Sequence, residues 1–237
     1  MSLVQRPSSK LQIALVGDSG IGKKSLLERI GQIGRRDTYD SAPWGTYYIG
    51  RIHLSIPIHR PLSHTADLSS GTTASAARAA SNVPRNGKDT EDPVKNVDID
   101  LITWIIHPSV YEDSPVMAYS MLSKVGVIGL CYKVSCKESL ENAIHKWYPL
   151  ILYWFPTVSV VLVGCQADLR TASVSTNHTA HVLPEDAAKA AREIDAVCFI
   201  EGTSFDKSST RQVFELLAWH AYHHKISKER TLGSVIQ

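Results

Sequence analysis

The chain has 237 residues, of which 43% are hydrophobic and 20% are charged, and its formal net charge is +2. This length is sufficient for one domain with a full hydrophobic core, and the nearly neutral balance argues against a nucleic-acid partner. The four cysteines form no Cys-x-x-Cys pair, which favours buried thiols over disulfides or zinc. We therefore expect a single globular unit in the reducing environment of the cytoplasm.

Neither a secretory leader nor a membrane anchor is expected. The N-terminal tail, 1–10, is polar and lacks the apolar core of a signal peptide. The longest apolar run, 148–163, is broken by prolines and is shorter than the roughly 20 residues that a membrane span requires. At the C-terminus, Ser234-Val-Ile-Gln237 has the shape of a prenylation box but carries serine in place of the acceptor cysteine. We therefore expect no stable membrane anchor.

The stretch from Gly17 to Ser25 directly follows the apolar run 11–16, which is typical of a strand that leads into a phosphate-binding loop and a helix. Backbone N–H groups of such a loop surround an anion, and Lys23 is placed to reach the outer phosphates. The pattern G-x-x-x-x-G-K-[ST] requires a hydroxyl after the lysine to bind Mg²⁺, but here Lys24 holds that place. The expected phosphate-contacting residues are Gly17, Ser19, Gly20, Gly22, Lys23, Lys24 and Ser25.

Strands and helices alternate along the rest of the chain. We expect further strands over residues 46–56, 97–106, 125–134, 158–164 and 196–200. Helices are expected over residues 24–30, 116–124, 137–147, 184–194 and 210–224. A polar surface loop should cover 35–45, and Pro149 should begin a link after the third of these helices. The alternation predicts a doubly wound, mostly parallel α/β sheet with helices on both faces and the ligand at the carboxyl ends of the strands.

Composition predicts how this domain is bounded. The domain should cover 11–224 and be followed by a C-terminal tail, 225–237. Residues 60–95 consist largely of Ser, Thr, Ala, Asn, Asp and Pro, and such a segment buries too little apolar surface to offset its ordering entropy. We therefore expect a disordered insertion within the domain.

Two motifs carry a resemblance to a known family. The segment Glu141-Asn-Ala-Ile-His-Lys-Trp-Tyr-Pro149 resembles the family's helix end E-N-x-x-x-K-W-Y-P, and Val161-Leu-Val-Gly-Cys-Gln-Ala-Asp-Leu-Arg170 resembles its base-recognition motif L-V-G-T-K-x-D-L-R. The chain thus resembles a Rho-type small GTPase of the Ras superfamily from about residue 11 to 222, the insertion excepted. The resemblance implies the P-loop small G-protein fold and GTP or GDP as cofactor.

The resemblance also implies roles for residues of the base site. Asp168 keeps the carboxylate that accepts both N–H donors of guanine, and Gln166 replaces the lysine that covers the base. Thr203 and Ser204, in a segment that resembles the family's E-C-S-A, would offer backbone N–H groups to the base. A loop or cap role for Asp168 remains the alternative.

The metal and γ-phosphate sites depart from the family pattern. Pro43 falls at or next to the place of a metal-binding threonine, and the family's D-T-A-G-Q corresponds to Thr103-Trp-Ile-Ile-His107. Only His107 then offers a polar group near the place of the water-positioning glutamine. A histidine at a strand end is more often a capping residue, so no catalytic residue is assigned. Ser25 is the nearest hydroxyl for Mg²⁺, whose ligand set is incomplete.

Three functions are compatible with these motifs. The first is a GTP-binding signalling switch that hydrolyses slowly or not at all, and the second is a nucleotide-free pseudo-GTPase scaffold for protein interactions. The third, a P-loop enzyme of other specificity, is disfavoured by the two family motifs. The resemblance implies protein effectors or regulators that contact residues 40–52 and 107–119.

Overall fold

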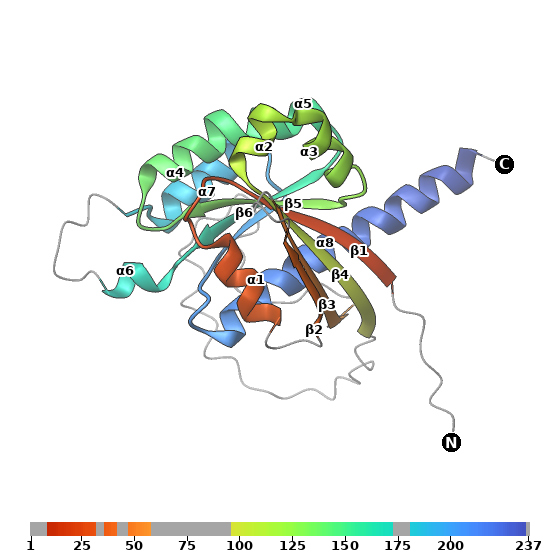
Figure 1. Ribbon diagram of the computed structural model, residues 1–237, viewed down its shortest axis with the longest axis horizontal. Coiled ribbons are helices and arrows are strands. Elements are labelled where there is room, and N and C mark those ends of the chain that lie inside the picture. Colours follow the sequence, from red (N-terminus) through yellow and green to blue (C-terminus); the bar gives the residue numbers. More distant parts are fainter. Residues whose placement is uncertain (1–8, 32–35, 42–46, 58–95, 173–180, 236–237) are drawn as a thin grey trace, which may run out of the picture.

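The computed structural model describes residues 9–31, 36–41, 47–57, 96–172 and 181–235, and its centre is a 7-stranded sheet of order β2-β3-β4-β1-β5-β6-β7 (Figure 1). The strands are β1 (Ser9–Val16), β2 (Arg36–Ser41), β3 (Tyr47–Pro57), β4 (Asn96–Ile106), β5 (Val127–Lys133), β6 (Ser159–Cys165) and β7 (Cys198–Gly202). The helices are α1 (Lys23–Gly31), α2 (Pro108–Asp113), α3 (Pro115–Leu122), α4 (Lys137–Asn142), α5 (Tyr148–Trp154), α6 (Asp168–Ala172), α7 (Pro184–Glu193) and α8 (Lys207–Val235). A π-helical segment, η2 (Ala143–Trp147), joins α4 to α5.

Parallel pairing dominates the sheet. β1 pairs in parallel with β4 on one side and with β5 on the other, and β6 and β7 continue the parallel series. β3 and β2 extend the sheet in antiparallel fashion beyond β4. The predicted doubly wound, mostly parallel α/β fold is therefore confirmed. Because β1 lies between two parallel neighbours, the loop after it opens at the carboxyl edge of the sheet, where ligands of such folds bind.

Helices cover both faces of the sheet (Figure 1). α1 and α8 pack against one face, where Ile13 and Leu15 of β1 are completely buried. Ala14 and Val16 alternate with them and lie in the core of the opposite face, which residues of α2 to α5 and α7 complete. β5 and β6 are buried on both faces, which explains why their sequences are continuous apolar runs.

The edge of the sheet corrects one expectation. The polar segment 35–45 was predicted to be a surface loop, but Arg36–Ser41 forms β2 and pairs with β3, for example through Asp40 and Ile49. An edge strand needs one hydrogen-bonding neighbour and no apolar face of its own. The strand is therefore decided by β3 rather than by its own polar sequence.

The helix predicted to end at Trp147 continues to Trp154. α4 passes into η2 and then into α5, so that Pro149, predicted to begin a link, lies in the first turn of α5. Proline is tolerated there because its missing N–H is not needed at a helix start. The π-helical turn before it changes the hydrogen-bonding pattern at the point where a proline would interrupt an α-helix.

Two other helices differ from the expectation. α2 lies in a segment predicted only as bounded by prolines, and it starts with Pro108 directly behind the capping residue His107. α8 was predicted to end at His224 but runs to Val235, so most of the expected tail, 225–237, is helical. Residues 227–231 are exposed, so this end of the helix has no buried stripe that a periodicity search could find.

The predicted insertion, 60–95, lies outside the described residues. Across the described segments, each helix is either too short or too polar to span a bilayer.

Two phenylalanines test the position of the core. Phe214 of α8 is completely buried, so Phe214→Ala should lower the free energy of unfolding by about 3–5 kcal/mol through lost burial and a new cavity. Phe205 is 79% exposed, so Phe205→Ala should change it by less than about 0.5 kcal/mol. Urea unfolding of both variants makes the comparison, and equal losses would contradict the packing of α8.

Candidate phosphate-binding site

The phosphate loop turns sharply where β1 ends. Gly17 and Gly22 have φ angles of 140° and 107°, in the region that favours glycine. A Cβ atom on Gly17 would also collide with the carbonyl oxygen of Cys131 on β5. The loop is therefore seated against the neighbouring strand, and α1 begins directly behind it at Lys23.

The ammonium group of Lys23 lies inside this loop. Its Nζ donates to the carbonyl oxygen of Gly17 at 2.7 Å and to that of Asp18. The residue is only 6% exposed, and burial lowers the pKa of its ammonium group. Both of these hydrogen bonds go to neutral carbonyl oxygens, so a phosphate in the loop would supply a closer countercharge for this buried cation.

Asp18 fastens the loop to the helical layer. Its two carboxylate oxygens accept hydrogen bonds from Asn142 Nδ2 at 2.9 Å and from Trp147 Nε1 at 2.8 Å. Trp147 is itself buried and makes an edge contact with the ring of Tyr111 in α2. Asn142 and Trp147 belong to a family motif in the sequence, but Asp18 was not predicted as a site residue because these partners are 124 and 129 residues away.

A cavity of about 310 Å³ opens beside the loop. The predicted site residues that line it are Ser19, Gly20, Gly22, Lys23, Lys24, Ser25, His107 and Gln166. Its remaining walls are apolar and come from Ile105, Ile106 and Pro108. The phosphate loop, the end of β4 and the start of the base motif, far apart in sequence, thus share one cavity.

His107 closes one side of this cavity and caps α2. Its Nδ1 accepts the backbone N–H of Ser109 at 3.3 Å, so the neutral ring carries its proton on Nε2. Nε2 lies 3.4 Å from Oγ of Ser19 in the phosphate loop. The imidazole therefore bridges the end of β4 and the loop, and the capping role considered for this histidine is present.

The structure places Thr103 away from the position expected for the first residue of the family's D-T-A-G-Q. That segment follows a strand, whereas Thr103 lies inside β4, pairs with Ile13 and is completely buried. Because β4 continues to Ile106, the segment after the strand begins at His107. His107 is thus the first residue after the strand, and its correspondence to the family's glutamine stays a prediction.

The donors around the cavity do not fit Mg²⁺, which prefers oxygen ligands and especially carboxylates. No carboxylate is among the described residues that line it, and Lys23 and Lys24 contribute ammonium groups. Lys24 pairs with Glu28 at 3.8 Å, and both side chains are about half exposed, so the pair adds little stability. Ser25 lines the cavity as a hydroxyl, and Pro43 lies outside the described residues. We therefore assign no chemical step to a metal.

Gln166 connects the base motif to the phosphate loop. Its φ is 59°, and a Cβ atom added to Gly22 would lie 3.3 Å from Gln166 Cγ. Behind it, Asp168 accepts a hydrogen bond from Thr203 Oγ1 at 2.5 Å. Asp168, Thr203 and Ser204 are not among the residues that line the cavity, so the predicted base residues divide into two groups.

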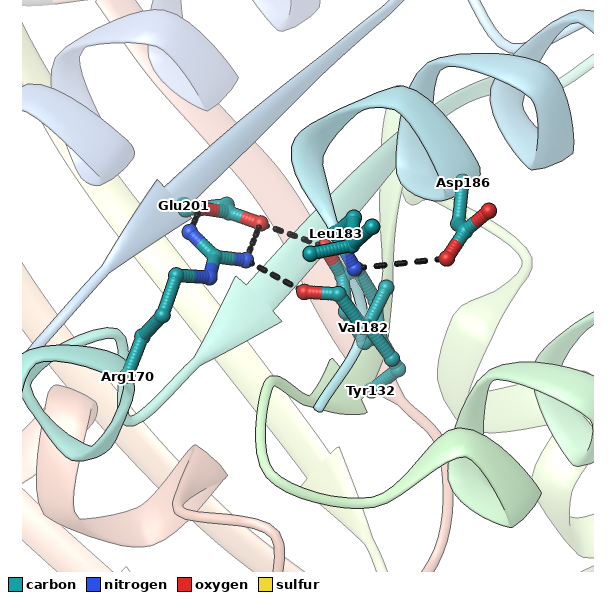
Figure 2. Close-up of polar contacts among 6 residues, drawn as sticks. All are labelled: Tyr132, Arg170, Val182, Leu183, Asp186 and Glu201. Atoms are coloured by element: carbon teal, nitrogen blue, oxygen red, sulfur yellow. Dashed lines mark hydrogen bonds and ion pairs between the residues drawn. The ribbon is translucent and has the colours of Figure 1, made fainter. Parts of the chain in front are cut away.

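A network of ionic and hydrogen bonds holds α6 against β7 (Figure 2). Arg170 donates to both carboxylate oxygens of Glu201, at 2.5 and 2.7 Å, and to the carbonyl oxygen of Val182 at 2.7 Å. The hydroxyl of Tyr132 donates to the same carboxylate at 2.9 Å. Burial raises the pKa of Tyr132, and the hydrogen bond with Glu201 raises that of Arg170. The network stabilises the turn of helix that carries Asp168.

Two glutamates test this network. Glu201→Ala leaves Arg170 partly buried without its carboxylate, so the free energy of unfolding should fall by about 3 kcal/mol. Glu215 pairs with Arg211 one helical turn away, where the arginine side chain is 50% exposed, so Glu215→Ala should cost less than about 1 kcal/mol. Denaturant unfolding measures both, and similar losses would argue against the network.

Comparison with known proteins adds to this geometry. The model of the Ras family matches residues 112–223, which include the network of Figure 2 but not the phosphate loop. GTP-binding protein rhoC of Emericella nidulans is 24% identical over 220 residues, which cover 91% of this chain and 64% of that protein. Rho-related protein racO of Dictyostelium discoideum is 28% identical over 128 residues, which cover 51% of this chain and 46% of that protein.

The matches thus span less than two thirds of the length of either relative. The sheet order and the phosphate loop, found independently of these comparisons, are those expected of a P-loop small G-protein fold. Over the matched residues the chain is therefore similar to the Ras family and to Rho-type GTP-binding proteins.

Proposed function

We propose that the protein is a Rho-like signalling switch or adaptor that binds GTP or GDP and hydrolyses GTP slowly or not at all. The observation that carries the proposal is a contrast within one cavity. The phosphate side has the glycine loop and the buried ammonium group of Lys23. The metal side has Lys24 where the family pattern requires a hydroxyl, and the described residues that line it include His107 but no carboxylate.

Binding keeps more of its contacts than hydrolysis does. Each hydrogen bond to a charged group contributes roughly 1.5–3 kcal/mol, and the loop N–H groups, Lys23 and Asp168 all remain to make such bonds. Hydrolysis also needs a metal that neutralises developing charge and a group that positions water. His107 faces Ser19 at 3.4 Å and gives its other ring nitrogen to the cap of α2. We therefore assign no catalytic residue.

A nucleotide-free scaffold is the second candidate, and one observation favours it. Lys23 donates to carbonyl oxygens of its own loop, and Asp168 accepts from Thr203. Both groups thus have protein partners without a ligand.

Either function requires a protein partner, and we propose that it contacts residues 40–52 and 107–119. The second segment includes α3, whose Val116, Met117 and Tyr119 are 72%, 43% and 44% exposed. Exposed apolar side chains gathered on one short helix suit a protein partner better than solvent.

The nucleotide state can be measured directly. Denatured protein should release GTP or GDP in stoichiometric amount on ion-exchange chromatography, and added nucleotide should raise the melting temperature of the empty protein. Lys23→Gln should abolish the thermal shift because it removes the buried cation, while Lys189→Gln, on the exposed side of α7, should preserve it. An empty protein with no shift would support the scaffold instead.

The lack of a complete set of metal ligands among the described residues around the cavity predicts that nucleotide release is independent of Mg²⁺. Because no carboxylate is among the described residues that line the cavity, EDTA should leave the release rate of the wild type unchanged, and GTP turnover should stay below that of an ordinary unassisted small GTPase. Lys24→Thr/His107→Asp supplies a hydroxyl and a carboxylate, so EDTA should accelerate its release by about tenfold or more. The single variants Lys24→Thr and His107→Asp are the controls for this double variant. Ordinary turnover, or EDTA-sensitive release from the wild type, would contradict the prediction.

A further inference from the structure

A second cavity, of about 300 Å³, lies at the end of β1 opposite to the phosphate loop. We call it the lysine groove, and its polar lining residues include Lys10 and Gln12 of β1, Lys124 before β5, and His224, Lys225 and Lys228 of α8. Four ammonium groups from three separate segments converge on it, and none of the lining residues that the structure describes is an aspartate or glutamate. The tertiary structure has thus gathered like charges in one place.

This clustering has no compensation within the described part of the chain, where the four lysines form no ion pair. Asp100 stands opposite Lys10 in the register of β1 and β4, but its carboxylate lies 3.0 Å from Nδ1 of His53 and does not line the groove. Like charges held together without a countercharge are destabilising. An anion in the groove would remove that repulsion.

The base of the groove is rigid. Gly126 N donates to the carbonyl oxygen of Gln12 at 2.9 Å, which fixes the segment after Lys124 against β1. The indole N–H of Trp104 donates to Gln12 Oε1 at 3.1 Å. This bond uses the carboxamide oxygen of Gln12 and not its NH₂ group. Leu11 and Ala221 are buried beneath. The groove is therefore largely formed before any ligand arrives.

We propose that the lysine groove is a binding site for an anion with two or more phosphate groups, of the size of an inositol phosphate. Its volume is at the lower end of small-molecule sites, which are roughly 300–1,000 Å³. Ammonium groups bind phosphates as point charges and do not require the planar geometry of a guanidinium. Gly17 is seven residue steps beyond Lys10 along an extended strand, about 23 Å at roughly 3.3 Å per step, so the groove and the phosphate loop cannot share one ligand.

Charge reversal tests the site with the full chain. Soluble inositol trisphosphate should bind the wild type in isothermal titration calorimetry, with an affinity that falls as salt rises. Lys124→Glu/Lys228→Glu should weaken binding about tenfold or more, since two phosphate-binding charges become repulsive. Lys137→Glu/Lys189→Glu makes the same change of net charge on exposed positions of α4 and α7 and should leave the affinity unchanged.

A third variant separates the groove from the phosphate loop. Lys23→Gln should leave trisphosphate binding unchanged, because the groove is at the opposite end of β1. Circular dichroism and the melting temperature of each variant check that the fold is kept. No binding to the wild type, equal losses in both charge-reversal variants, or a loss confined to Lys23→Gln would each overturn the proposal.

Vesicles distinguish a lipid headgroup from a soluble phosphate. Recruitment to phosphatidylcholine vesicles that contain phosphatidylinositol bisphosphate, with displacement by soluble trisphosphate, would support the groove with a headgroup as its ligand. Calorimetric binding without recruitment would support the groove with a soluble ligand. Equal recruitment by phosphatidylserine vesicles of the same charge, without displacement, would overturn the proposal in favour of diffuse attraction to a negative surface.

Discussion

The buried ammonium group of Lys23 is the constraint on which the rest of the site depends. A cation at 6% exposure needs oxygen atoms around it, and the carbonyl groups of Gly17 and Asp18 provide them. Those carbonyls reach it because glycine conformations bend the loop and because the Asp18 side chain is held by Asn142 and Trp147. The sheet, the phosphate loop and the helical layer together thus fix the position of the Lys23 ammonium group.

This placement separates two properties that a nucleotide-binding loop usually combines. The fold needs the glycines, the lysine and the seat on β5, and all of these are present. A metal-assisted reaction also needs oxygen ligands around the cavity, where Lys24 follows Lys23 in the loop and His107 lies at the end of β4. His107 lies 3.4 Å from Ser19 Oγ, so the end of β4 and the phosphate loop meet across the cavity. The lysine groove at the opposite end of β1 adds a second cationic cavity, so phosphate chemistry is favoured at both ends of this strand.

Elements with a strong local pattern were predictable. A few adjacent residues are enough to indicate such an element. Examples are the apolar runs of β5 and β6, the proline and acidic residues at the start of α7, and the glycine loop. Elements that depend on distant partners were not. β2 is polar and exists through pairing with β3, and the helix continues past Pro149 because a π-helical turn precedes it. The position of Thr103 inside β4 was not predictable either, because pairing with β1 and β3 carries this strand on to Ile106.

The sequence by itself determined the class of fold, the phosphate loop and the loss of the hydroxyl after Lys23, because each rests on residues adjacent in the chain. Only the tertiary structure decided that Gln166 packs over Gly22, that Asp18 is anchored to Trp147, and that four lysines meet in one groove. Each of these contacts joins segments brought together by the order of parallel strands. Strand order is a property of the whole sheet, so no local pattern in the chain encodes it.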